Sequence, residues 1–219
     1  MLICHHGHAE FLLETADGFR VLTDPYDAHV GYPMYDVQCD AVSISHGHGD
    51  HNYTQKAQGN IAICDRAGAC RLGDGMKATG IACWHDDKQG ALRGENRIFV
   101  FEMDGLRVAH LGDLGAWDEE LARQLYGVDV MLIPVGGHYT IDAKSAAALV
   151  KQVKPRICIP MHYATSVNSD WPITDVEAFL QEMGAPDAPR MPLLRVTRQD
   201  LSVQPHIVVI TERKSHACK

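Results

Sequence analysis

Short apolar runs separated by turn residues dominate the first half of the chain. Such runs predict strands over residues 10–15, 19–24, 41–45, 60–64 and 78–83. The Asp104-Gly105 dipeptide then predicts a tight turn that joins the strands of a hairpin, RIFVFEM and LRVAHLG. Residues 26–39 lack a comparable pattern, so we expect a loop there.

The second half alternates between apolar strands and helices. We expect strands over 129–135 and 156–160, and one or two more within 193–211. Helices are predicted over 118–127, 142–154 and 174–184, the last capped by Thr174. This order indicates a single α/β domain over 1–219 in which two sheets are sandwiched between helices. The tail from about residue 212 is expected to be frayed.

Composition and charge narrow the partners that this chain can have. It is 46% hydrophobic and 22% charged, as expected for a globular protein, and carries a net charge of −8. A net negative charge without basic runs argues against nucleic acid as a partner. No apolar run is long enough to span a bilayer, and MLICHHGH does not resemble a signal peptide. We therefore expect a cytoplasmic protein with no membrane or nucleic-acid partner.

Seven cysteines are scattered along the chain without a CxxC pair. Several stand in apolar contexts, such as Cys64 in NIAIC and Cys158 in RICIP. Cysteines of this kind usually behave as small buried hydrophobic residues. The expectation is that the chain forms no disulfides.

The stretch SHGHGDH, residues 45–51, carries the clearest chemistry. His46 and His48 are two positions apart, so they point the same way in an extended chain, and the intervening glycines let the backbone turn sharply. Asp50 and His51 then begin the next element, which we expect to be a helix. Two ligands can face one ion and two a neighbouring ion, and imidazole with carboxylate suits Zn²⁺, Mn²⁺ or Fe.

Further ligands are expected from the ends of other strands, where concave sites collect. His85 follows the strand ATGIACW, Asp113 lies in the turn after LRVAHLG, and His162 follows RICIPM. Each residue has a plainer alternative: His85 as a surface residue in a charged loop, Asp113 as a turn or capping residue, and His162 as a partly buried residue bonded to a carbonyl.

Several segments together match a known pattern, in order along the chain. They are GHAEFLLE at 7–14, TDP at 23–25, SHGHGDH at 45–51, HDDKQGALRGEN at 85–96, GLRVAHLGDLG at 105–115, PVGG at 134–137 and IPMHY at 159–163. On these segments the sequence resembles the metallo-β-lactamase fold superfamily. It resembles most closely the branch of small, ascorbate-phosphate-lactonase-like, metal-dependent hydrolases.

The resemblance implies a four-layered αβ/βα sandwich with two divalent metal ions at one edge, with zinc favoured over manganese or iron. The implied ligands of the first ion are His46, His48 and His85. Those of the second ion are Asp50, His51 and His162, and Asp113 bridges both.

The resemblance also implies hydrolysis of a small molecule of the lactone, phosphorylated lactone or phosphodiester class. A single Zn²⁺ lowers the pKa of its water to about 7, and two cations would supply a metal-bridging hydroxide as the nucleophile. Asp50 is the expected catalytic residue, which would orient the nucleophile or carry a proton to the leaving group.

Four further residues are placed near the centre. Asp24 and His8 lie in the matched N-terminal segments and are expected to support a ligand or line the pocket, with local turn bonding as the alternative. For His110, three residues before Asp113, we favour a supporting or core role over ligation. His138, after PVGG, is expected near the pocket.

Other interpretations stay open at this point. The scaffold could carry iron-dependent redox chemistry, or the chain could be a non-catalytic ligand-binding module. Arg93 and Arg97 could meet an anionic substrate, although a solvated hairpin is the favoured interpretation. The segment 29–37 could be a substrate lid, a contact in a homo-oligomer, or a mobile solvent-facing loop.

Overall fold

The computed structural model describes residues 1–73, 75–201 and 206–212. Its first sheet contains six strands in the order β15-β1-β2-β3-β5-β7. These are β1 (Leu2–Gly7), β2 (Glu10–Glu14), β3 (Arg20–Thr23), β5 (Ala41–Ser43), β7 (Ala62–Cys64) and β15 (Leu194–Arg195). In this sheet β1, β3 and β5 run in one direction, because β2 is antiparallel to β1 and β3, and β3 is parallel to β5.

The second sheet contains seven described strands in the order β16-β13-β12-β11-β10-β9-β8. They are β8 (Gly68–Gly73), β9 (Met76–Trp84), β10 (Glu95–Met103), β11 (Leu106–His110), β12 (Val130–Pro134), β13 (Ile157–Met161) and β16 (His206–Ile207). The predicted hairpin is β10 and β11, which pair antiparallel. The strands β11, β12 and β13 are parallel. Both β12 and β13 are buried along their whole length, as expected for parallel strands covered on both faces.

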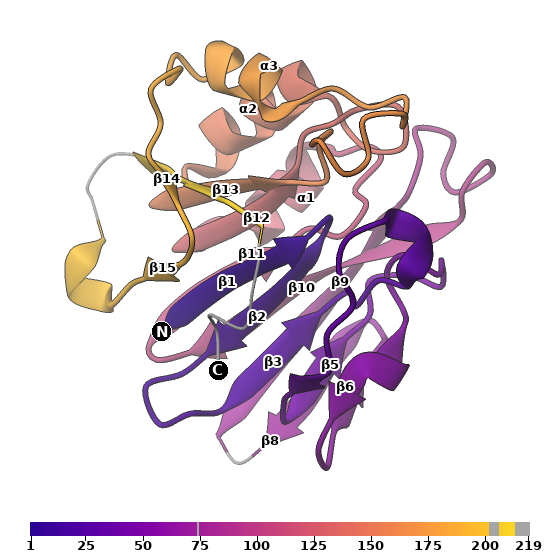
Figure 1. The fold of residues 1–219 in the computed structure, drawn as a ribbon. Coiled ribbons are helices and arrows are strands. Elements are labelled where there is room, and N and C mark those ends of the chain that lie inside the picture. The colour runs from indigo at the N-terminus through magenta and orange to yellow at the C-terminus, as the bar shows by residue number, and fades with distance from the viewer. Residues whose placement is uncertain (74, 202–205, 213–219) are drawn as a thin grey trace.

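The two sheets pack face to face, and the helices cover the outer side of the second sheet (Figure 1). Alternation along β10 shows both contacts: Phe99 and Phe101 face the first sheet, while Ile98 and Val100 face the helices. The helices are α1 (Glu119–Gln124), α2 (Ala143–Val153) and α3 (Val176–Glu182). The α/β sandwich expected from the sequence is confirmed. The N-cap of α3 is Asp175, whose side chain accepts from the backbone N–H of Glu177, and not Thr174.

The outer face of the first sheet is covered differently. A small apolar cluster, which includes Leu12, Leu22 and Val42, lies beneath loops and short turns. In the described residues this layer contains the 3₁₀ turns η1 (Ala28–Val30) and η2 (Thr54–Lys56), with no α-helix. The helix expected after Asp50 is therefore replaced by a 3₁₀ turn. The minor pairs complete the fold: β4 (Val37–Gln38) with β6 (Ala57–Gln58), and β14 (Arg190–Met191) with β17 (Val209–Ile210), while η3 (Arg198–Asp200) follows β15.

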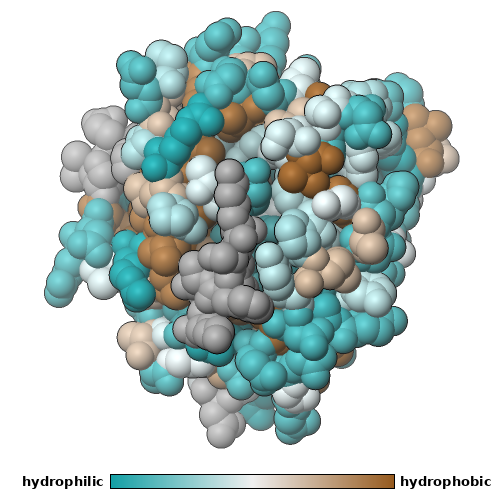
Figure 2. Space-filling model, in the orientation of Figure 1, coloured by the Kyte–Doolittle hydropathy of each residue, from teal (hydrophilic) through white to brown (hydrophobic). Residues whose placement is uncertain are grey.

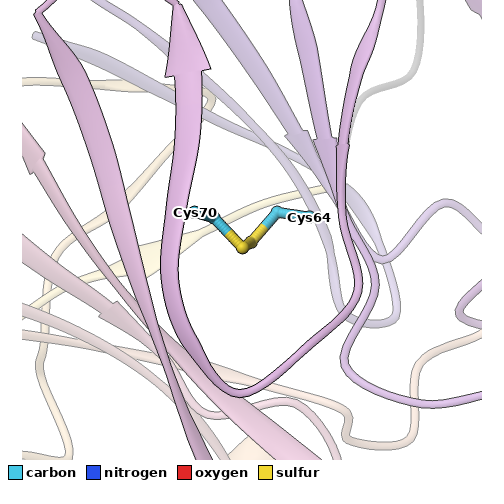
Figure 3. The surroundings of a disulfide bond; sticks show 2 residues. All are labelled: Cys64 and Cys70. Carbon is cyan, nitrogen blue, oxygen red and sulfur yellow. A yellow bond between two sulfur atoms is a disulfide. The ribbon is translucent and has the colours of Figure 1, made fainter.

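A disulfide joins Cys64 and Cys70, so the expectation of no disulfides is wrong (Figure 3). Cys64 ends β7 at the edge of the first sheet, and Cys70 lies in β8 at the edge of the second. The bond therefore ties the two sheets together where the chain crosses between them. Because disulfides persist in oxidising surroundings, the cysteines no longer support the expectation of a cytoplasmic location. Cys39 and Cys158 are buried free thiols, as expected.

The described helices are all too short or too polar to cross a bilayer. The face drawn in Figure 2 is mostly hydrophilic, and its hydrophobic residues lie in small separate groups. This distribution is typical of a protein surface in water.

A buried ion pair connects the first sheet to the loops that cover it. The carboxylate of Glu10 is fully buried, and Lys56 Nζ donates to its Oε2 at 2.8 Å. His6 Nδ1 lies 2.8 Å from Oε1, and the backbone N–H of Tyr26 donates to Oε2. Burial raises the pKa of Glu10, but the hydrogen bond and charge of His6 and the charge of Lys56 outweigh it and hold that pKa below its ordinary value. The pair therefore fixes the start of the loop after β3.

We predict that Lys56→Met lowers the free energy of unfolding by about 3–5 kcal/mol, because it leaves a buried carboxylate without its cation. Urea titration at pH 7 measures the change. Lys88→Met is the control, since Lys88 is exposed and pairs only with exposed Asp87, and it should change stability by less than about 0.5 kcal/mol. Equal losses in the two variants would contradict the prediction.

The same pair should make stability depend on pH in acid. Because the folded-state pKa of Glu10 is lowered, its stabilisation is complete above the ordinary Glu pKa of about 4.3 and is lost as the pH falls toward the folded-state pKa. Glu10→Gln combined with Lys56→Met should flatten this dependence in urea titrations from pH 3 to 6. An unchanged acid slope in the double variant would refute the assignment.

Candidate metal centre

Six strands end at one edge of the sandwich and carry the predicted site residues there. In the first sheet, His8, Asp24 and His46 follow β1, β3 and β5. In the second sheet, the residues that follow β9, β11 and β13 are His85, Asp113 and His162. These strands point the same way within each sheet, so their carboxyl ends meet and the side chains converge from distant parts of the chain.

The carboxylate of Asp113 is the meeting point of this edge. Its Oδ1 lies 3.3 Å from His51 Nε2, and its Oδ2 lies 3.3 Å from both His85 Nε2 and His162 Nε2. His46 Nε2 is 3.9 Å from the same Oδ2. The structure thus brings imidazoles from three different segments around one buried carboxylate.

The remaining two predicted ligands, His48 and Asp50, lie at the rim of this group. His48 Nδ1 is 3.1 Å from His46 Nε2, and those two residues form one compact set of potential metal ligands with His85. Asp50 Oδ2 is 3.7 Å from His51 Nε2. All seven predicted ligands are therefore brought together, and their ligation of metal stays a prediction.

The donor atoms are arranged as metal ligands would be. Two nitrogen or oxygen donors on one tetrahedral Zn²⁺ lie about 3.3 Å apart, given metal–ligand bonds of about 2.0–2.1 Å. The donor separations around Asp113 have this value. His51 Nε2 and Asp113 Oδ1 are buried and lack a hydrogen-bond partner among the described atoms. Such atoms are costly unless a cation satisfies them, so the residues fit a metal centre.

The burial of His46 favours its role as a ligand. Burial, together with the charge of His51, lowers the pKa of His46 to about 3. Its Nδ1 lies 2.9 Å from Ser45 Oγ, which leaves Nε2 to face the centre. A neutral imidazole with one nitrogen held by a neighbour is the form that binds metal.

Asp24 forms hydrogen bonds with Ser45 and His51, two residues of the histidine-rich stretch. It is fully buried, and its Oδ1 accepts from the backbone N–H of Ser45 at 2.8 Å. Its Oδ2 lies 2.8 Å from His51 Nδ1 and also accepts from Ser45 Oγ. Because His51 Nδ1 is engaged by Asp24, its Nε2 is directed at Asp113. This is the supporting role expected of Asp24.

The carboxylates around His51 favour positive charge at this position. Burial lowers the pKa of His51, but the charge of Asp113 and the hydrogen bond of Asp24 raise it well above its ordinary value. Burial raises the pKa of Asp113, yet the charges of His162 and His51 hold it well below its usual range. A bound cation would be stabilised by the same carboxylates.

His8 lies against the second group of ligands. Its Nε2 is 3.2 Å from Asp50 Oδ2, and its ring lies 4.2 Å from the ring of His162. Burial, with the charge of His162, lowers the pKa of His8 to about 4. Within the described residues, His8, His51 and His162 also form a compact set of potential ligands. His8 thus orients Asp50 and borders the centre.

Left-handed backbone conformations concentrate at this edge. His8, Asp24 and His162 have φ values of +56°, +40° and +52°. The conformation is uncommon outside glycine and costs about 1–3 kcal/mol per residue when strained. It persists at functional sites because the surrounding structure holds it. Here the backbone N–H of His162 donates to the carbonyl of His8, which ties two of the three residues together.

Asn96 supports the turn that carries Asp113, although the sequence pattern does not single it out. Its Nδ2 donates to the carbonyl of Leu111, and its Oδ1 accepts from the backbone N–H of Asp113. Gly112 packs against it so closely that a Cβ would lie 2.5 Å from Asn96 Oδ1. In the sequence Asn96 stands between the polar residues Glu95 and Arg97 at the start of β10, and only its burial in the structure distinguishes it from them.

Asp86, directly after His85, organises the next loop and is also absent from the predicted residues. Its carboxylate is buried and accepts four backbone N–H bonds, from Lys88, Gly90, Leu92 and Arg93, at 2.7–3.0 Å. Desolvation raises the pKa of Asp86, but these N–H donors hold it below its ordinary value. The acidic loop that served as the plainer alternative for His85 is therefore a folded turn.

A cavity of about 620 Å³ opens above the centre. Its floor is formed by His48, Asp50, His85, Asp113 and His162. Its walls include Asp27 and His29 from the loop after β3, Arg93, Tyr139, and the segment 170–172. This volume is typical of a small-molecule site.

The remaining predicted residues occupy separate places. His110 is fully buried, with Nε2 2.7 Å from the carbonyl of Ala9 and Nδ1 accepting from the N–H of Gly112, so backbone groups engage both nitrogens. His138 is exposed and lines a neighbouring cavity of about 330 Å³. Tyr32, within segment 29–37, is buried and hydrogen-bonded to Thr165, so that segment is docked on the protein.

Comparisons with known proteins agree with this geometry. A family model described as a beta-lactamase superfamily domain matches residues 2–162. The UPF0173 metal-dependent hydrolases of Thermococcus onnurineus and Archaeoglobus fulgidus are 32% and 34% identical to this chain. The alignments cover 81% and 75% of this chain, and 90% and 84% of the relatives. A solved structure from Thermotoga maritima, assigned to the metallo-β-lactamase superfamily, is 32% identical with a TM-score of 0.78, covering 97% of this chain and 99% of that one.

We predict that Asp24→Asn weakens Zn²⁺ binding by about 10- to 100-fold, because an uncharged amide has one acceptor oxygen and cannot satisfy all three donors that Ser45 and His51 direct at Asp24. Asparagine tolerates the left-handed backbone at this position, so the fold should survive. Calorimetric titration with Zn²⁺ measures the affinity, and circular dichroism checks the fold. Asp87→Asn, in an exposed residue, is the matched control. Unchanged zinc affinity in a folded Asp24→Asn protein would disprove the supporting role.

Proposed function

The chain belongs to the metallo-β-lactamase superfamily and is a metal-dependent hydrolase, and from that premise we propose that it hydrolyses a small-molecule substrate with two divalent ions. The observation that supports the proposal is that six candidate ligands gather around a seventh, Asp113, with neighbouring donor atoms 3.1–3.9 Å apart. Two separate compact sets of donors, His46 with His48 and His85, and His8 with His51 and His162, favour a dinuclear centre over a single ion.

Zinc is the favoured ion. The Thermotoga maritima relative is assigned as Zn-dependent, and a set of imidazoles with carboxylates suits zinc. Manganese and iron accept the same donors and remain the alternatives to test. When bound, such ions supply a water molecule of lowered pKa as the nucleophile and polarise the oxygen of the group under attack.

We assign separate roles to the residues of the proposed centre. His46, His48 and His85 would hold one ion, Asp50, His51 and His162 the other, and Asp113 would contact both. Asp50 also faces the cavity, with a side chain that is 23% exposed and held by His8. Its Oδ2 can orient a water molecule and pass a proton to the leaving group.

The cavity limits the substrate to a small molecule. About 620 Å³ holds a ligand of metabolite size and excludes a polymer from the floor. A lactone, a phosphorylated lactone or a phosphodiester fits both the volume and the chemistry. The net charge of −8 supports a small-molecule partner over nucleic acid.

We predict that chelation lowers turnover by at least about 10²-fold, the loss typical of removing one electrostatic stabiliser of a transition state. Adding back Zn²⁺ should restore it at about two ions per chain, measured by elemental analysis alongside assays on lactone and phosphodiester substrates. Full turnover in metal-free protein would overturn the proposal. Oxygen consumption by iron-loaded protein, without hydrolysis, would favour the redox alternative.

We predict that Asp50→Asn lowers kcat by about 10²-fold at saturating Zn²⁺, because the amide cannot accept a proton. Elemental analysis of the same sample establishes whether both ions are still bound. Asp65→Asn, in an exposed residue outside the cavity, serves as control and should retain full turnover. An Asp50→Asn protein with both ions and full turnover would remove the catalytic role.

A further inference from the structure

The cavity above the metal centre is lined by charged side chains of both signs. Among its described lining residues, Arg93 is the one lysine or arginine. Asp27 and Asp170 line the cavity on the side formed by His29 and Trp171, whose rings lie 6.0 Å apart. A ligand in this cavity therefore meets one guanidinium and two carboxylates among the lining groups.

The guanidinium of Arg93 is placed to receive a ligand. It faces the ring of Tyr139, with Cζ 5.7 Å from the ring centroid, and no carboxylate of the described chain pairs with it. Arg97 differs, because it donates to the carbonyl of Ser45 and pairs with Glu95. Of the two arginines, only Arg93 lines the cavity and keeps its donors for an incoming group.

The loop that carries Arg93 is rigidly built. The backbone N–H of Arg93 donates to Asp86 at 2.7 Å, and that of His85 donates to the carbonyl of Gly94 at 3.1 Å. The loop therefore begins at a metal ligand and ends at Arg93, and Asp86 fixes its interior. Because the backbone of this loop is held before an anion binds, less conformational freedom is lost on binding.

Aromatic rings continue the wall from Arg93 toward the floor. The ring of Tyr139 lies 6.2 Å from that of Trp171, and Trp171 lies 5.4 Å from the ring of His8. Both aromatic residues are half-buried and line the cavity. They offer an apolar surface between the cationic wall and the metal ligands.

We propose that Arg93 is a specificity-determining residue that selects substrates bearing an anionic phosphate or carboxylate, with the body of the substrate lying on Tyr139 and Trp171. This inference rests on the proposed hydrolase function and specifies its substrate class. Guanidinium recognises phosphate and carboxylate through the same paired N–H donors. The carboxylates of Asp27 and Asp170 in the same lining disfavour a second anionic group and favour hydroxyl donors near them.

The test compares Arg93→Met with the wild-type zinc-loaded protein on three lactones that share one scaffold: neutral, carboxylate-bearing and phosphate-bearing. Arg93→Met should lower kcat/KM for an anionic lactone by about 10- to 100-fold, the range for a hydrogen bond between charged groups. The neutral lactone should change by less than about twofold. Arg93→Lys should recover part of the loss, and Lys88→Met, in an exposed residue of the same loop, should have no effect.

Calorimetry with phenyl phosphate and with benzoate provides a readout that does not need turnover. Loss of affinity in Arg93→Met for one probe alone assigns phosphate or carboxylate as the group selected. Equal losses on neutral and anionic lactones, or no loss on any, would overturn the inference while the hydrolase function stands. If the wild-type protein hydrolyses none of the lactones, the proposed function fails for this class. In that case calorimetry tests the role of Arg93 by itself. Equal affinities of the wild-type protein and Arg93→Met for both phenyl phosphate and benzoate would overturn the inference.

Discussion

Imidazole nitrogens that lie 3.3–3.9 Å from the oxygens of the buried Asp113 carboxylate are the constraint on which the rest of this structure depends. Such atoms repel unless positive charge lies between them, and burial makes the repulsion stronger. The protein therefore holds three of these residues in place with hydrogen-bond partners behind them. Asp24 engages His51, Ser45 engages His46, and Asn96 engages the backbone of Asp113. This arrangement suits a metal-dependent hydrolase, the family to which the chain belongs, because a bound cation would remove the repulsion.

The sandwich supplies what this centre needs, because six strand ends meet at one edge. The cost of assembly is visible in the left-handed backbone of His8, Asp24 and His162 and in the buried polar groups around them. Packing between the sheets is nearly all apolar, so the stability of the core offsets that cost at the edge. The buried Glu10–Lys56 pair acts on the loop side, where it fixes the chain that leads from Asp24 into the cavity wall.

Much of the fold and the gathering of the candidate ligands at one edge could be predicted from the sequence, for reasons that differ between elements. The strands β12 and β13 are continuous apolar runs, and the Asp104-Gly105 turn has a strong local signal, so each is readable alone. His46, His48 and His51 stand together, whereas His85, Asp113 and His162 are recognisable only as residues past strand ends. The 3₁₀ turn after Asp50 has no local signal that separates it from a helix start. The Cys64–Cys70 disulfide depends on two strands meeting at a sheet edge, and apolar neighbours suggested buried thiols instead.

Asp86 and Arg93 show why substrate recognition is harder to predict from the sequence than the fold or the candidate ligands. Asp86 acts through four backbone N–H groups, so its role follows from the path of the loop and not from any residue type near it. The same path carries Arg93 from a hairpin position, where a solvated arginine was the favoured interpretation, to the wall above the metal ligands. Because one turn joins His85 to Arg93, a change in the length of this loop would move the cationic wall while the strand ends kept the ligands in place. In the segment from His85 to Arg93, the first residue thus belongs to the candidate metal centre, and the last determines the charge of the cavity wall.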